Sequence, residues 1–127
     1  MAVESMDVRI EKTRNTPYFG ISEGLIEIKG RSIPEDAFEF FEPVVDSIKH
    51  FLNSTNSPIT FNIHLDYVNS GSKKYLTNIL KILEDHKNKG VQVNINWLFD
   101  KDDESIMELG QDLASLMQLQ FHFMEIE

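Results

Sequence analysis

Strict alternation of apolar and polar residues predicts five β-strands along this chain. The clearest example, residues 59–67, places every second residue on an apolar face that ends with Tyr67. The opposite face carries threonine, asparagine, histidine and aspartate side chains, ending with His64 and Asp66. A period of two residues is typical of a strand with one buried face. The same alternation predicts strands over residues 6–11, 25–29, 59–67, 91–97 and 121–126.

Three amphipathic helices are predicted between these strands. Apolar residues spaced three and four apart form one stripe after Pro34, a second from Tyr75 to Leu83 and a third from about Asp103. Pro34 suits a first helical turn, whereas Pro43 lies inside the first stripe and is expected to kink the helix or restart it. The predicted order of elements is therefore β-β-α-β-α-β-α-β.

This order predicts a two-layer α/β fold. Strands joined through helices pair mostly in parallel, because the helix carries the chain back to the same end of the sheet. Strands covered on both faces read as continuous apolar runs, yet the third and fourth strands keep a polar face. We therefore expect one mixed five-stranded sheet with helices mainly on one face. No linker or repeat interrupts residues 1–127, which predicts a single domain.

Composition and charge narrow the classes of partner. The chain of 127 residues has no cysteine, which excludes disulfides and thiolate metal sites. Twelve basic residues against 21 acidic ones give a net charge of −9, which argues against nucleic acids and anionic membranes as partners. The N-terminal segment lacks the apolar core of a signal peptide, and no apolar window is long enough to span a membrane. A cytoplasmic protein that meets other proteins is expected.

The polar turn at residues 69–72 is the main candidate site. It joins a strand directly to a helix, and helix N-termini bind anions well. Helix capping alone explains one polar side chain of the turn. It does not explain Lys73 and Lys74, whose charges in the first helical turn are unfavourable to the helix dipole. An anion bound at the turn would explain them. A phosphate on Ser70 is such an anion, and Ser72 is the second choice as acceptor.

The loops at the carboxyl ends of parallel strands gather at one edge of a sheet. By this rule the turn at Ser70 neighbours Asp100, which follows the fourth strand, and Arg31 joins them if the second strand is also parallel. This edge is the expected recognition surface for a protein partner. Its candidate binding residues are Tyr67, Asn69, Ser70, Gly71, Ser72, Lys73, Lys74, Arg31 and Asp100.

The sequence gives little support for a metal site or an enzyme active site. An EF-hand loop counted from Asp100 has Ser105 where glycine is required and Gln111 where glutamate is required. The four histidines lack the HxH or HxxxH spacing of metal ligands, so neither a metal nor a cofactor is expected. His64 and Asp66 share one strand face and could act as an acid/base pair, but a solvated sheet face explains them better. We therefore expect a protein that is not an enzyme.

Three motifs in the second half of the chain are distinctive together. They are Tyr67-x-Asn69-Ser70-x-Ser72-x-Lys74, VNINWLFDKDD, which ends at Asp103, and MELGQDLASLMQLQFHF, from Met107 to Phe123. With these motifs the chain resembles one family of bacterial regulators, the SiaC family of regulatory phosphoproteins. The similarity covers about Thr16 to Ile126.

The resemblance implies a fold similar to the STAS domain and a partner-switching function. In this family a serine/threonine kinase with a histidine-kinase-type ATPase fold is thought to phosphorylate the strand–helix turn, and a metal-dependent protein phosphatase reverses the modification. The unmodified form binds and activates a GGDEF diguanylate cyclase, which raises cyclic-di-GMP and promotes biofilm formation. Ser70 is the position that matches the phosphoacceptor. Where the family commonly has Thr-Ser-Ser, this chain has Ser-Gly-Ser, which keeps the first hydroxyl. The alternative is a constitutive scaffold or oligomerisation module whose turn serves only as a helix cap.

Overall fold

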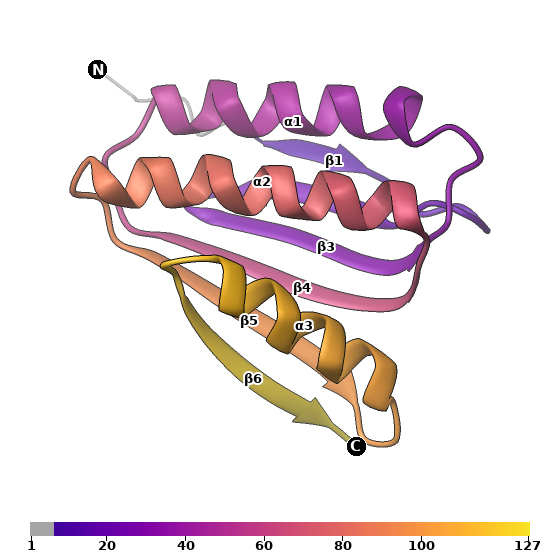
Figure 1. Cartoon of the computed structure of the whole chain (residues 1–127). Helices are drawn as coiled ribbons and strands as arrows, with labels where there is room; N and C mark the ends of the chain where they lie inside the picture. The colour runs from indigo at the N-terminus through magenta and orange to yellow at the C-terminus, as the bar shows by residue number, and fades with distance from the viewer. Residues whose placement is uncertain (1–6) are drawn as a thin grey trace.

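The sheet of this protein has six strands, and their order in the sheet is their order in the chain. The computed structural model describes residues 7–127. The first three strands pair antiparallel, and the third to the sixth pair in parallel, so the sheet is mixed (Figure 1). The strands are β1 Val8–Ile10, β2 Tyr18–Ser22, β3 Leu25–Ser32, β4 Ile59–Val68, β5 Val93–Asp100 and β6 Gln120–Ile126.

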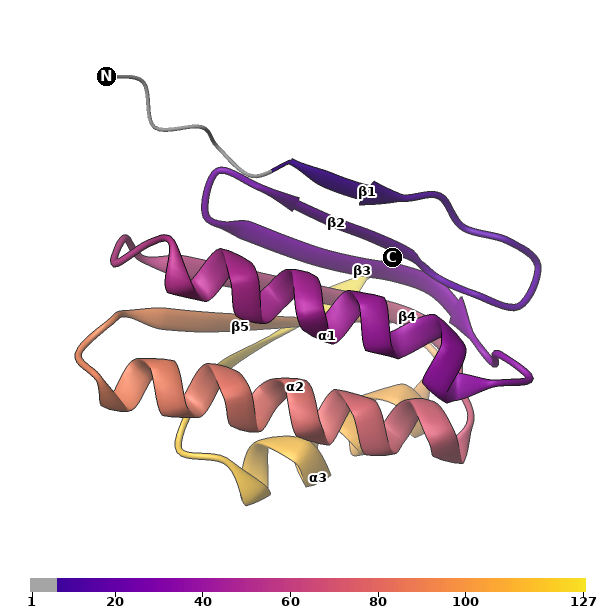
Figure 2. The same ribbon diagram turned by 90° about the horizontal axis from the view of Figure 1, so that it is seen from above.

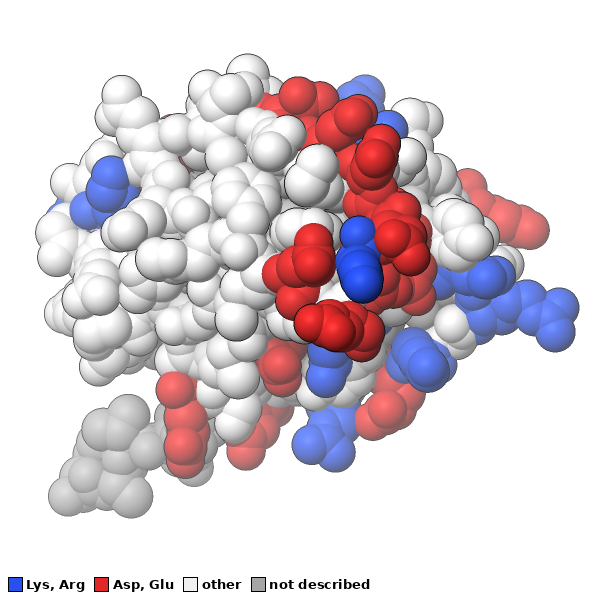
Figure 3. All heavy atoms as spheres, turned by 90° about the horizontal axis from the view of Figure 1, so that it is seen from below, with Lys and Arg blue, Asp and Glu red and all other residues white. Residues whose placement is uncertain are grey.

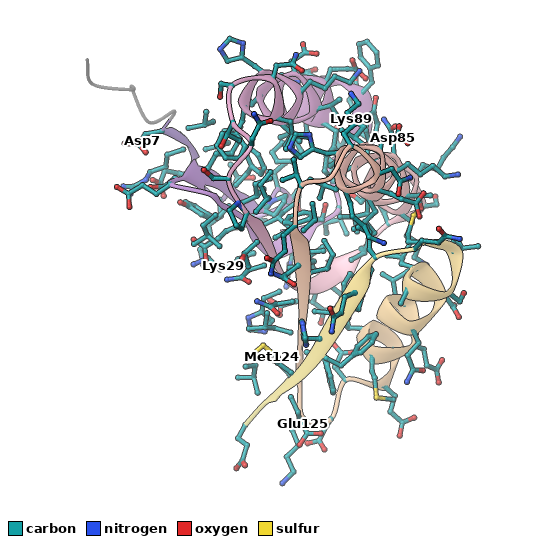
Figure 4. All side chains as sticks on the ribbon, turned by 90° about the vertical axis from the view of Figure 1, so that its left-hand side faces the viewer. Asp7, Lys29, Asp85, Lys89, Met124 and Glu125 are labelled. Atoms are coloured by element: carbon teal, nitrogen blue, oxygen red, sulfur yellow. The ribbon has the colours of Figure 1, made fainter. Side chains whose placement is uncertain are left out.

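Three helices cover one face of this sheet, as Figures 1 and 2 show together. They are α1 Ala37–Asn53, α2 Ser70–Asn88 and α3 Glu104–Leu116. Within residues 7–127 the opposite face carries no helix, and Lys29 and Met124 project from that side (Figure 4). The expected two-layer arrangement with helices on one face is therefore correct.

The predicted number of strands, five, and the predicted order of elements are wrong, because β2 was missed. Its sequence, YFGIS, is short and has a central glycine, which weakens the strand pattern. The hydroxyl end of the Tyr18 side chain lies against Gly20, so a side chain at position 20 would displace it. A two-residue hairpin turn then leads into β3, with positive φ angles at Glu23 (48°) and Gly24 (83°). The observed order is β-β-β-α-β-α-β-α-β.

The predicted restart of the first helix at Pro43 is also wrong, because α1 runs without interruption from Ala37 to Asn53. The Pro43 side chain is exposed. The carbonyl that loses its hydrogen-bond donor to proline therefore lies on the solvent side of the helix, where water can replace the donor. The helix begins at Asp36, whose carboxylate accepts a 3.0 Å hydrogen bond from the Glu39 backbone N–H.

One hydrophobic core fills the space between the sheet and the helices. Trp97 lies fully buried at its centre, and its indole Nε1–H donates a 2.9 Å hydrogen bond to the Ile106 carbonyl of α3. The ring lies directly against Gly110, whose missing side chain makes room for it. Within residues 7–127, no helix has both the length and the apolar character that crossing a membrane requires.

Candidate functional site

The strand–helix turn is organised by Asn69, the N-cap residue of α2. Its side-chain oxygen accepts a 3.0 Å hydrogen bond from the Ser72 backbone N–H, and its side-chain nitrogen donates one of 3.1 Å to the Pro34 carbonyl. The capping function is thus performed by the asparagine and not by either serine. The same side chain ties the start of α2 to the segment that leads into α1.

The Ser70 hydroxyl is free for other chemistry. Its side chain is exposed, and it makes no hydrogen bond to any other residue of the described chain. The backbone N–H groups of Ser70 and Gly71 also lack acceptors among the described residues, as is usual at the first turn of a helix. An exposed hydroxyl therefore lies beside two unpaired N–H donors.

Ser72, the second choice as phosphoacceptor, lies in a different environment. Its side chain and that of Ser32 are both fully buried. The Ser72 hydroxyl donates a 2.9 Å hydrogen bond to the Ser32 carbonyl and lies 2.7 Å from the Ser32 hydroxyl. A kinase needs an exposed hydroxyl, so this geometry favours Ser70 over Ser72.

The neighbouring residues set the shape and charge of the turn. A Cβ atom on Gly71 would come within 2.8 Å of the Ala37 Cβ, so glycine lets the starts of α2 and α1 approach each other closely. Lys73 and Lys74 are exposed, and neither forms an ion pair with another described residue. The two ammonium groups therefore remain available to an anion bound at the turn.

Tyr75, one turn further along α2, holds the two helices together. Its ring stacks on Phe41 with centroids 5.0 Å apart, and its hydroxyl donates a 2.8 Å hydrogen bond to the Glu42 carboxylate. That hydrogen bond to Glu42, supported by desolvation, raises the pKa of Tyr75 above its ordinary value. The turn at residues 69–72 thus leads into a helix whose first turns are fixed against α1.

The three strand ends that were predicted to share one edge of the sheet do share it. β3, β4 and β5 are parallel, so Arg31, the turn at Ser70 and Asp100 lie towards the same edge of the sheet. The Arg31 guanidinium lies over the Tyr67 ring, 4.9 Å from its centroid. This cation–π pair presents a flat, exposed and positively charged surface beside the turn.

Tyr67 itself lies on the face opposite to the one that the sequence pattern predicted. Its side chain is 58% exposed, whereas alternation placed it with the buried residues of β4. The β3–β4 pairing shifts register between Gly30, which pairs with Leu65, and Arg31, which pairs with Tyr67. This irregularity leaves Asp66 as an extra residue, and an extra residue reverses the alternation beyond it.

His64 contacts a residue that sequence reasoning did not connect with it. Its Nε2 atom lies 3.0 Å from Asp100 Oδ1, across from β4 to β5. The possible pair considered above was His64 with Asp66 on the same strand. The contact was missed because spacing along one strand carries no information about a neighbouring strand.

Acidic side chains dominate one end of the molecule, where Figure 3 shows them gathered around a basic group. At the carboxyl edge, a shallow hollow is lined by Asp100, Lys101, Asp102, Asp103 and Glu127, together with Ile126. The edge of the sheet at the carboxyl ends of β3, β4 and β5 therefore combines a basic surface at Arg31, Lys73 and Lys74 with an acidic surface after β5. A protein that binds this edge needs complementary charges of both signs.

Comparison with known proteins identifies a family and a relative of this chain. Its residues 10–126 match the model of the SiaC family of regulatory phosphoproteins. An uncharacterised protein of Pseudomonas aeruginosa strain UCBPP-PA14, PA14_02130, is 31% identical over 108 residues, which are 84% of this chain and 86% of that protein.

Solved structures of Pseudomonas aeruginosa proteins share the fold. SiaC in complex with the diguanylate cyclase SiaD, which it activates, superimposes with a TM-score of 0.88 at 28% identity, covering 94% of this chain and 100% of that one. Apo-SiaC gives a TM-score of 0.85 at 26% identity, covering 94% of this chain and 98% of the other. This chain therefore belongs to the SiaC family of regulatory phosphoproteins and is a regulatory protein rather than an enzyme.

Proposed function

We propose that this protein is a cytoplasmic partner-switching regulator controlled by phosphorylation of Ser70. The unmodified form binds a GGDEF diguanylate cyclase and activates it, which raises cyclic-di-GMP and promotes biofilm formation. The observation that carries the proposal is the exposed, unbonded Ser70 hydroxyl at the start of α2, in a chain that belongs to a family of regulatory phosphoproteins. The complex of the relative SiaC with the cyclase SiaD supports the choice of partner.

The proposed modification suits the local chemistry. A serine/threonine kinase with a histidine-kinase-type ATPase fold transfers the γ-phosphoryl group of ATP to the Ser70 hydroxyl, and a metal-dependent protein phosphatase hydrolyses it. The phosphate adds a charge of about −1.5 to −2. The free N–H groups of Ser70 and Gly71, with the helix dipole and Lys73 and Lys74, stabilise that charge. The folded protein therefore accepts the modification without rearrangement.

The same charge acts against a bound partner. In the unmodified state the edge presents a small neutral hydroxyl beside the Arg31–Tyr67 pair, so another protein can pack closely on it. A phosphate there needs solvation or cationic partners, and a surface that packs on the turn leaves it neither. Phosphorylation also neutralises the lysines that an acidic partner surface would bind. Binding and phosphorylation are therefore expected to exclude each other.

The test compares Ser70→Ala, Ser70→Asp and wild type for binding to the cognate diguanylate cyclase and for the cyclic-di-GMP formed. Ser70→Ala is expected to bind and activate as wild type does, and to be insensitive to the kinase. Ser70→Asp is expected to bind at least tenfold more weakly. Ser105→Asp is the matched control, because Ser105 is an exposed serine in the first turn of α3. Equal binding by Ser70→Asp and wild type would contradict the proposal.

The scaffold alternative has one observation in its favour, because β6 is an edge strand with Phe123 (41% exposed) and Met124 (45% exposed). It predicts a stable oligomer by light scattering and no phosphate on Ser70 by mass spectrometry. The partner-switching proposal predicts phosphate at Ser70 when the kinase is present, whatever the oligomeric state.

A further inference from the structure

A histidine and two aspartates from neighbouring strands converge on the sheet face that carries no helix. His64 and Asp66 come from β4, and Asp100 is the last residue of β5. One imidazole nitrogen and one oxygen from each carboxylate lie within 4.8 Å of one another. We call these three residues the His64 cluster. Their convergence depends on strand pairing, so the spacing of histidines along the chain gave no sign of it.

The sheet fixes this arrangement through its register. His64 lies beside Leu98, and Asp66 and Asp100 each follow two residues later on their parallel strands. The Asp66 side chain is exposed, and the alternation along β4 places it on the same face as His64. The cluster is therefore built on the strands themselves and not on a mobile loop.

The charges of the His64 cluster are not balanced by basic side chains. Two neighbouring carboxylates repel each other when both are ionised. Within residues 7–127, no lysine or arginine lies within ion-pair distance of either carboxylate, and the only contact of this kind is the 3.0 Å one between His64 and Asp100. A cation placed between the three donor atoms would remove the repulsion.

We propose that the His64 cluster is a binding site for a divalent transition-metal ion of the zinc class. The imidazole nitrogen and one oxygen from each carboxylate are the ligands, and water completes the coordination. An imidazole ligand favours such ions over Mg²⁺ and Ca²⁺, which prefer oxygen ligands. Ligand bonds of about 2.0–2.2 Å place tetrahedral donors roughly 3.3 Å apart. Donors already within 4.8 Å reach that spacing by small side-chain rotations.

Access and electrostatics both suit an exchangeable ion. The side chains of His64 and Asp100 are 29% and 58% exposed, so an ion reaches the site without opening the fold. Asp102, Asp103 and Glu127 lie around the same end of β5, where Figure 3 shows acidic groups gathered. Their field raises the local concentration of cations. The proposed metal site does not include Ser70, so a failure of either proposal leaves the other unaffected.

Calorimetric titration of the chelator-treated full chain with Zn²⁺ tests this proposal. Wild type is expected to bind one ion with an affinity at least tenfold greater than for Mg²⁺. Co²⁺ bound at the same site is expected to show the visible absorption of nitrogen and oxygen coordination.

Matched variants locate the ion. His64→Gln and, separately, Asp100→Asn are each expected to weaken Zn²⁺ binding at least tenfold. His122→Gln removes an exposed histidine of β6 that lies outside the cluster, so it should bind Zn²⁺ as wild type does. Asp100 is exposed at the end of its strand, which makes Asp100→Asn informative even if His64→Gln misfolds. The proposal is overturned if wild type binds Zn²⁺ no better than His64→Gln and Asp100→Asn do, or if Mg²⁺ binds to wild type equally well.

Discussion

Two serines separated by one residue have opposite surroundings in this protein. Ser70 is exposed and unbonded, whereas Ser72 is buried and bonded to Ser32. The difference follows from the geometry of a helix start, where successive side chains point in directions about 100° apart. One serine can therefore serve as a modification site while the other stabilises the fold.

This contrast predicts the stability of the two alanine variants. Ser72→Ala should lower the free energy of unfolding by about 1–3 kcal/mol, because it leaves the buried Ser32 hydroxyl without its acceptor. Ser70→Ala should change it by less than about 0.5 kcal/mol, because it removes an exposed side chain. Urea denaturation of both variants beside wild type measures the difference. A larger loss for Ser70→Ala would mean that the exposed serine, not the buried one, holds the turn.

A second residue-scale prediction concerns His86 on α2. The residue is only half-buried, but its Nε2 atom is buried and has no hydrogen-bond partner among the described residues. Desolvation, with a smaller contribution from Lys89, lowers the pKa of His86 below its ordinary value of 6.5. Lys89 is the C-cap residue of the same helix, and Figure 4 shows it near Asp85. The neutral imidazole is therefore the form that the fold favours.

Stability should depend on pH accordingly. Because the pKa of His86 is lower in the folded protein, the unfolded chain binds a proton at this residue more readily. The stabilising contribution of neutral His86 is therefore complete above pH 6.5 and is lost as the pH falls through the lowered pKa. His86→Gln, which stays neutral, should show a smaller fall in unfolding free energy between pH 7.5 and pH 5.5 than wild type. His50→Gln removes an exposed histidine of α1 and should show the same fall as wild type. Identical falls for all three proteins would contradict the prediction.

At the scale of elements, α3 packs closely against Trp97 of β5. Gly110 leaves space for the Trp97 ring, and the indole N–H bonds to the Ile106 carbonyl of the same helix. A methyl group at position 110 would overlap the ring, so the helix or the tryptophan must move. Movement of either would weaken the hydrogen bond and admit water to the core.

Gly110→Ala should therefore destabilise the protein by about 1–3 kcal/mol, the usual cost of overpacking, although alanine is the better helix former. Trp97 is the only tryptophan, so its fluorescence reports the change directly, and a shift to longer wavelength is expected in the folded variant. Gln111→Ala is the control, because Gln111 is the exposed next residue of α3. A stability equal to wild type would show that the helix adjusts without cost.

The elements also show what could be predicted from the sequence. Long alternating strands such as β4 and β5 and the strongly amphipathic helices were correctly located, because one period governs all their residues. The five-residue β2 was missed, since it owes its place to pairing with β1 and β3 rather than to its own pattern. Tyr67 was assigned to the wrong face because a register irregularity has no signature in one strand alone.

The candidate site at the strand–helix turn could likewise be predicted only in part. The strand–helix turn and the shared carboxyl edge followed from local pattern and topology. The burial of Ser72 and the contact from His64 to Asp100 depend on residues 40 and 36 positions away along the chain. Such contacts between distant segments are fixed only when the sheet has formed. The sequence alone therefore predicted the turn at residues 69–72 but did not show which of its two serine hydroxyls is exposed.

At the scale of the whole molecule, polarity is divided between the two faces of one sheet. Helices bury one face, and the other presents polar and charged groups to solvent, as Figure 4 shows from the side. The turn at Ser70 lies where the helix layer and the sheet meet at the carboxyl edge. A protein that binds there can contact both the helix layer and the sheet, which suits a regulatory protein that acts by binding partners.

The strand order β1 to β6 also bears on how the chain is made. Each strand lies next to the strand that precedes it in the sequence, so every segment leaving the ribosome can add to an edge that already exists. No strand has to be inserted between two others, and no early strand waits for a late partner. The fold can therefore grow from the N-terminus in the order of translation, and β6 completes it last.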